Sequence, residues 1–126
     1  MSEILEMYPR LVVAGADEAL KFYTRAFGGT VSERFADDSG QVMHAMVQAG
    51  PVKFAVKDAD TVDAAPDGGG LPVIMAVYVT DPDAVAERMV EGGAEVLFPV
   101  VDHDYGDRAG RLRDPFGHLW MIARKS

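Results

Sequence analysis

Apolar residues recur at helical spacing in a stretch near the start of the chain. In residues 17–29, Leu20, Tyr23 and Phe27 fall on one face of a helix, while the intervening charged residues face water. Asp17 precedes this stripe and is the expected N-cap. A double glycine follows the stripe and can supply the left-handed conformation that ends helices. The pattern predicts an amphipathic helix.

The same pattern returns 64 to 66 residues later. Here Asp81 is the expected N-cap, Pro82 suits the first helical position, and Val85 and Met89 mark the apolar stripe. A second double glycine ends the stretch. Self-similarity at a fixed offset predicts a chain built from two related units.

Each predicted helix is preceded by one run with strand character and followed by three. Turn residues separate most of these runs, and the stretch 59–71, rich in Asp, Ala and Gly, is typical of a linker. We therefore predict one domain over residues 1–126, made of two βαβββ modules at about 8–58 and 72–125 that share one core, because neither is large enough to bury a core alone. The runs are 8–13, 30–36, 41–49, 51–58, 72–79, 95–101, 108–113 and 118–124.

The composition of the chain mainly excludes classes of partner and of site. The chain has 12 Lys and Arg against 20 Asp and Glu, a net charge of −8, so its field would repel the phosphates of nucleic acid. It has no cysteine, which excludes disulfides and thiolate metal sites. No segment resembles a signal peptide or a membrane span, so we expect a cytoplasmic protein with neither a nucleic-acid nor a membrane partner.

Two motifs carry a resemblance to a known family. The sequence DEALKFYTRAFGG at residues 17–29 and the sequence DPFGHLW at residues 114–120 resemble the vicinal oxygen chelate superfamily, which includes glyoxalase I, extradiol dioxygenases and antibiotic-binding proteins. The resemblance implies an α+β fold in which two βαβββ modules form a curled eight-stranded mixed sheet. It also implies helices on the convex face, a ligand on the concave face, and a homodimer.

The resemblance further locates the metal site of the family's enzymes. Aligned on the two motifs, the positions that hold a metal ligand in those enzymes fall on Tyr8, Ala55, Ile74 and Met121. Divalent cations bind imidazole, carboxylate or comparable oxygen donors, which none of these side chains offers. We therefore expect no metal and no other cofactor.

Alternation along the strands predicts which side chains line the concave cavity. Successive residues of a strand point to opposite faces, and the uniformly apolar set belongs under a helix. Val42, His44, Met46 and Gln48 then share the cavity face of strand 41–49. The other residues placed in the cavity are Tyr8, Arg10, Ile74, Tyr78, Leu119 and Met121.

Two rim residues and one histidine carry the candidate chemistry. Tyr105 and Arg108 lie in a polar segment that should border the cavity, and an arginine can form a planar fork or stack on a ligand ring. His44 has three open roles: it can bind a ligand acceptor, act as a general base, or bond to a structural neighbour. These residues complete the predicted ligand-binding set.

The remaining polar and aromatic residues have structural interpretations. Trp120 falls on the helix-covered face and should be part of the core, and His118 should stabilise the turn that precedes it. Asp58, Asp60 and Asp63 lack the glycine and terminal glutamate of a calcium loop, so we expect them to be solvated.

These observations favour a binding protein over an enzyme. We expect metal-independent sequestration of an aromatic or cationic natural product, as in the antibiotic-binding branch of the family. The alternative is a metal-dependent lyase, isomerase or dioxygenase, which would need a displaced metal site at His44 or His103. A metal-free enzyme with His44 as catalytic base and a scaffold with an empty cavity also remain open.

Overall fold

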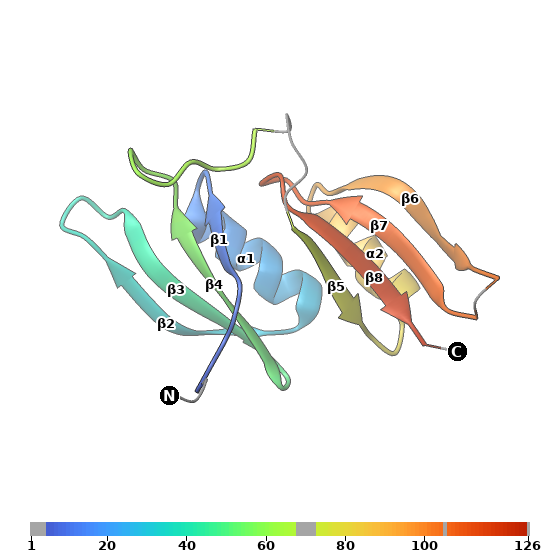
Figure 1. Cartoon of the computed structure of the whole chain (residues 1–126). Coiled ribbons are helices and arrows are strands. Elements are labelled where there is room, and N and C mark those ends of the chain that lie inside the picture. The colour runs from blue at the N-terminus through green and yellow to red at the C-terminus, as the bar shows by residue number, and fades with distance from the viewer. Residues whose placement is uncertain (1–4, 68–72, 105, 126) are drawn as a thin grey trace, which may run out of the picture.

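The structure, a computed structural model, describes residues 5–67, 73–104 and 106–125 of the chain. It contains two helices and eight strands in the order βαβββ, βαβββ, as predicted (Figure 1). The elements are β1 (Arg10–Val13), α1 (Ala16–Phe27), β2 (Thr30–Ala36), β3 (Val42–Ala49), β4 (Val52–Asp58), β5 (Ile74–Tyr78), α2 (Pro82–Glu91), β6 (Glu95–Asp102), β7 (Arg108–Arg113) and β8 (Leu119–Arg124).

Hydrogen bonding divides the eight strands into two mixed sheets of four. Sheet A has the order β1-β4-β3-β2 and sheet B the order β5-β8-β7-β6. In each sheet the first pair is parallel and the other two pairs are antiparallel. Figure 1 shows the sheets side by side with both helices behind them. The α+β class and the paired modules are thus confirmed, and each sheet keeps one face covered by a helix and one face open.

The two helices begin differently. At α2 the Asp81 side chain accepts a hydrogen bond from the backbone N–H of Ala84, as expected of an N-cap. At α1 the prediction of an Asp17 cap is wrong, because the N-cap is Gly15 and carries no capping side chain. The carboxylate of Asp58, at the end of β4, instead accepts from the Ala16 N–H at 2.7 Å. A residue distant in sequence thus caps α1.

One buried carboxylate joins the modules. Asp114, 3% exposed, accepts hydrogen bonds from the Tyr23 hydroxyl at 2.6 Å and the Trp120 indole N–H at 2.8 Å. Burial, together with the negative charge of Asp114, raises the pKa of Tyr23 well above its ordinary value. Nε2 of His118 bonds the Val12 carbonyl at 2.9 Å, a second link between the modules. Trp120 is 1% exposed, which confirms its place in the core.

Two expectations about side-chain placement are wrong. Val42 is buried in the helix-covered core rather than on the cavity face, because the β2–β3 register shifts beside it and interrupts the alternation of β3. The acidic cluster is not simply solvated: Asp60 and Asp63 both bond Nζ of the buried Lys57. A buried ammonium group requires such partners.

Candidate functional site

The faces of sheets A and B that point away from the helices, here called the open faces, receive most of the predicted ligand-binding residues. The alternation of side chains along each strand determines which residues these are. Leu11 and Val13 of β1, and Met75 and Val77 of β5, contact the core under the helices, so their strand neighbours point the other way. The predicted residues on the open faces are Arg10, His44 and Met46 in sheet A, and Ile74, Tyr78, Leu119 and Met121 in sheet B.

A chain of hydrogen bonds crosses the open face of sheet A. Nη1 of Arg10 lies 3.0 Å from Nδ1 of His44, and Nε2 of His44 lies 3.0 Å from Oε2 of Glu33. A guanidinium group can only donate, so Nδ1 accepts, and Nε2 therefore carries the proton and donates to Glu33. The Phe35 ring stacks beside the imidazole. In this arrangement His44 has no free lone pair with which to take a proton from a substrate.

The lysines of sheet A are also paired. Nζ of Lys53 bonds Glu6 and lies over the Tyr8 ring. Nζ of Lys57 lies 2.8 Å from Oδ2 of Asp60. This hydrogen bond, together with those from two backbone N–H groups, lowers the pKa of Asp60 to about 2. Each of these cations has its acidic partner within the first half of the chain.

The open face of sheet B carries an arginine that sequence reasoning missed. Arg111 of β7 stands between Met121 of β8 and Phe98 of β6, and its guanidinium lies 5.7 Å from the centre of the Phe98 ring. Its Nε is buried and has no hydrogen-bond partner among the described residues. Alternation could have located this side chain, because Leu112 faces the core and its neighbour must face the opposite side.

Arg108, one of the two predicted rim residues, lies apart from the residues on the open faces. Arg108 lies on the helix side of sheet B, where Nε and Nη2 each bond a carboxylate oxygen of Asp83 at 2.8 Å. Nη1 lies 3.3 Å from Asp102, and these two pairings raise the pKa of Arg108 above its ordinary value. Arg108 therefore does not join the residues on the open face. Tyr105, the other predicted rim residue, lies outside the described residues.

A cavity of about 530 Å³, here called the inter-module cleft, opens between the end of the β3–β4 hairpin and β5. Its walls are apolar and aromatic and come from both modules. Of the predicted ligand-binding residues with described positions, Tyr78 is the one that lines it. The rest of the lining is Pro9, Phe27, residues 49–54, residues 75–77, Val79, Val85 and Trp120.

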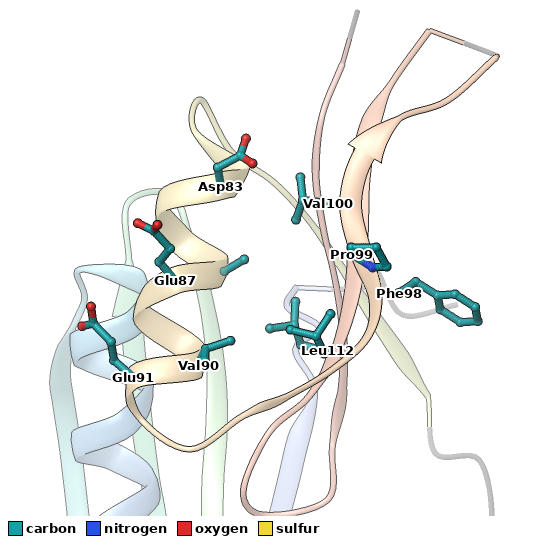
Figure 2. Close-up of a pocket in the computed structure, with 10 residues that line it drawn as sticks. Asp83, Glu87, Val90, Glu91, Phe98, Pro99, Val100 and Leu112 are labelled. Atoms are coloured by element: carbon teal, nitrogen blue, oxygen red, sulfur yellow. The ribbon is translucent and has the colours of Figure 1, made fainter.

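A second cavity, of about 490 Å³, lies on the helix side of sheet B between α2 and β6 (Figure 2). Val90, Val100 and Leu112 face one another across it, whereas Phe98 points away from α2 toward the open face. Among the predicted ligand-binding residues that the structure describes, none lines this cavity. The inter-module cleft is therefore the better candidate site.

The donor set does not fit a divalent metal. Ala55 and Met121 occupy corresponding positions on β4 and β8, each beside the first strand of its module, and neither has an oxygen or imidazole donor. Within the described parts of the chain, no group of three or more His, Asp or Glu side chains could hold a metal ion. No helix of these parts has the length and apolar character needed to cross a membrane.

Comparison with known proteins identifies the family. A family model described as the glyoxalase/bleomycin resistance protein/dioxygenase superfamily matches residues 7–122. "Uncharacterized protein Mb0911c" of Mycobacterium bovis is 35% identical over 92% of this chain and 80% of its own length. "Putative glyoxylase CFP32" of the same species is 32% identical over 84% of this chain and 41% of its own length.

Solved structures show the same fold. TioX from Micromonospora sp. is 26% identical with a TM-score of 0.70, covering 96% of this chain and 100% of its own. A glyoxalase family protein from Bacillus cereus is 21% identical with a TM-score of 0.78, covering 98% of this chain and 95% of its own. With the motifs at both ends of the domain and the paired βαβββ modules, these matches show that the chain belongs to the glyoxalase/bleomycin resistance protein/dioxygenase superfamily.

Proposed function

We propose that the protein binds an aromatic small molecule in the inter-module cleft without the help of a metal, and that it sequesters this molecule rather than transforming it. The observation that carries the proposal is the cleft itself. Its volume of about 530 Å³ falls within the range of about 300–1,000 Å³ typical of small-molecule sites. Phe27, Phe54 and Trp120 contribute rings to walls that are otherwise mostly aliphatic.

The charges around the cleft favour an aromatic ligand over a cationic one. Among the described residues that line it, Lys53 is the one charged side chain, and Glu6 pairs with it. The net charge of −8 therefore arises from residues elsewhere on the molecule, where it assists solubility. Binding in the cleft should come mainly from the burial of apolar surface.

The test is a titration with the neutral probe 2-naphthol, followed by calorimetry and by the fluorescence of Trp120, the only tryptophan. Val52 lines the cleft but is 60% exposed, so Val52→Asp should fold normally while placing a carboxylate in the apolar site. We expect this variant to weaken binding about tenfold or more. Val62→Asp, at a position that is 86% exposed and outside the cleft, is the control and should bind as the parent does.

Absence of saturable binding, or equal binding by the two aspartate variants, would show that the cleft is not the site. Chromatography of the recovered probe separates binding from catalysis. A metal-free enzyme is the second candidate. It would require the Arg10–His44 hydrogen bond to break, because both ring nitrogens of His44 are engaged by Arg10 and Glu33. Product formation that His44→Ala abolishes while affinity is retained would favour that enzyme over a binding protein.

A further inference from the structure

Arg111 has no counter-charge among the residues that the structure describes. Its Nε is buried and makes no hydrogen bond, and no ion pair or hydrogen bond joins its guanidinium to any residue that the structure describes. The two other arginines of β7 differ in this respect. Arg113, two residues along the same face of β7, lies 4.0 Å from Glu95, and Arg108 binds Asp83 and Asp102.

The guanidinium of Arg111 can therefore bind a hydrogen-bond acceptor from outside the chain. A guanidinium group has five N–H donors and no acceptor, so only a hydrogen-bond acceptor can satisfy Arg111. Nε is the shielded atom of a half-buried side chain, so the two Nη nitrogens form its accessible end. A carboxylate is the acceptor whose geometry matches two parallel guanidinium donors.

The surroundings of Arg111 define the rest of the ligand. Adjacent strands place Ala76, Met121, Arg111 and Phe98 in one row across the open face of sheet B. Ala76 also lines the inter-module cleft. Strands are about 4.8 Å apart, so β5 and β7 are separated by about 10 Å, and the Met121 thioether stands between them. Beyond the guanidinium, the Phe98 ring is 62% exposed and offers an aromatic surface.

We infer that the ligand is an extended aromatic acid, whose rings extend from the inter-module cleft over Met121 and whose carboxylate binds Arg111. This inference rests on the proposed function, because it gives the cleft's aromatic ligand an anionic group and a length. Met121 supplies a polarizable contact for the rings. Arg111, rather than Arg108, is then the arginine that binds the ligand.

The experiment compares biphenyl-4-carboxylate with its neutral analogue biphenyl-4-carboxamide, which has nearly the same length and shape. Calorimetry on the full chain measures the ratio of their dissociation constants. We expect the parent protein to prefer the carboxylate by about tenfold or more, as charge-assisted hydrogen bonds imply. Arg111→Gln should abolish the preference while it keeps the affinity for the carboxamide. Arg113→Gln, on the same strand and face, should retain the preference.

The outcomes separate the two proposals. If neither probe binds, the proposed function and the role of Arg111 are both wrong. If both probes bind with equal affinity to the parent, or if Arg113→Gln removes the preference as fully as Arg111→Gln does, only the role of Arg111 is wrong. Sedimentation of the same samples tests a different partner. If Arg111→Gln changes the oligomeric state and leaves the preference intact, this arginine binds a second copy of the chain, and the inference fails.

Discussion

The two modules present the same row of positions on their open faces and use it in opposite ways. In sheet A the row is Arg10, Ala55, Met46 and Glu33, and in sheet B it is Ala76, Met121, Arg111 and Phe98. Corresponding members lie 65 or 66 residues apart in the sequence. In sheet A the charges are at the two ends of the row and are joined through His44, whereas in sheet B a single charge stands in the middle.

This difference indicates that the first module serves as a framework and that the second module recognises the ligand. The first module compensates its charges internally, so its open face can hold its shape without a ligand. The second module leaves one guanidinium uncompensated beside an exposed ring, which is the arrangement expected where a ligand completes the site. A duplicated fold can thus keep its packing in both halves and vary only the side chains on the uncovered faces.

The turns between the last two strands of each module differ as well. In the second module this turn holds the buried Asp114, which reaches Tyr23 of the first module. In the first module the corresponding turn is Gly50-Pro51 and carries no such carboxylate. The contact between the modules should therefore depend on Asp114 more than on any residue of the β3–β4 turn.

Asp114→Ala should produce the largest loss of stability. It removes the acceptor of two side-chain and two backbone hydrogen bonds, from Tyr23, Trp120, Phe116 and His118, and leaves buried donors unpaired. We expect the free energy of unfolding to fall by about 3–5 kcal/mol, measured by urea denaturation. The control is Asp38→Ala in the exposed β2–β3 turn, where a change within about 0.5 kcal/mol is expected. Similar losses in the two variants would contradict the role of Asp114.

Gly110 of β7 corresponds to Ala45 of β3, 65 residues earlier in the sequence. In sheet B the β6–β7 register shifts so that Pro99 and Val100 together lie opposite Gly110. A Cβ atom at Gly110 would lie 2.8 Å from the Val100 backbone nitrogen and 2.9 Å from the Phe98 carbonyl oxygen. The first module has no such crowding at this position, because Ala45 already carries a methyl group in the core.

Gly110→Ala should therefore destabilise the protein by about 1–3 kcal/mol, since backbone atoms of β6 must move to admit the methyl group. The reciprocal change, Ala45→Gly, should cost about 1 kcal/mol through the lost packing and the greater freedom of the unfolded chain. Thermal unfolding of both variants measures the difference. An unchanged or raised melting temperature for Gly110→Ala would show that β6 is not held against β7 at this point.

Sequence patterns predicted the modules well, because helix stripes, glycine stops and strand alternation are local properties. They failed where a distant contact decides the outcome. Asp58, at the end of β4, caps α1 from 42 residues away in the sequence. The cleft residues Phe27 and Phe54 resemble ordinary core residues in sequence, and only the packing of the modules exposes them to a shared cavity.

The predicted ligand-binding residues of β1, β3, β5 and β8 lie on the open faces, whereas Arg108, near the β6–β7 loop, does not. Arg108 and Arg111 differ in parity along β7, so one faces α2 and the other the open face. Charge type alone could not distinguish them, because both are arginines in a polar stretch. The deciding fact is that α2 supplies Asp83 to Arg108, whereas no described residue supplies a carboxylate to Arg111.

The smallest expected effect comes from removing a compensated charge of sheet A, that of Lys57. Lys57, on the open face of sheet A, corresponds to Ala123 of sheet B, which needs no acidic partners. The hydrogen bond from Lys57, together with those from the backbone N–H groups of Asp63 and Val62, lowers the pKa of Asp60 from 3.8 to about 2. Because the folded pKa lies below the unfolded one, the Asp60 carboxylate stabilises the fold above about pH 4, and this contribution is lost as the pH falls toward 2.

Lys57→Met should weaken the pH dependence of stability that arises from the Asp60 carboxylate. We expect the Asp60 carboxyl resonance, followed by NMR, to titrate closer to 3.8 in the variant than in the parent. The difference in unfolding free energy between the two proteins should be constant between about pH 5 and 9 and shrink below pH 4. It should also shrink above pH 10, because the same pairing raises the pKa of Lys57 above 10.5. Asp60 titrating near 2 in both proteins would mean that backbone hydrogen bonds from Val62 and Asp63, rather than Lys57, hold its carboxylate ionised.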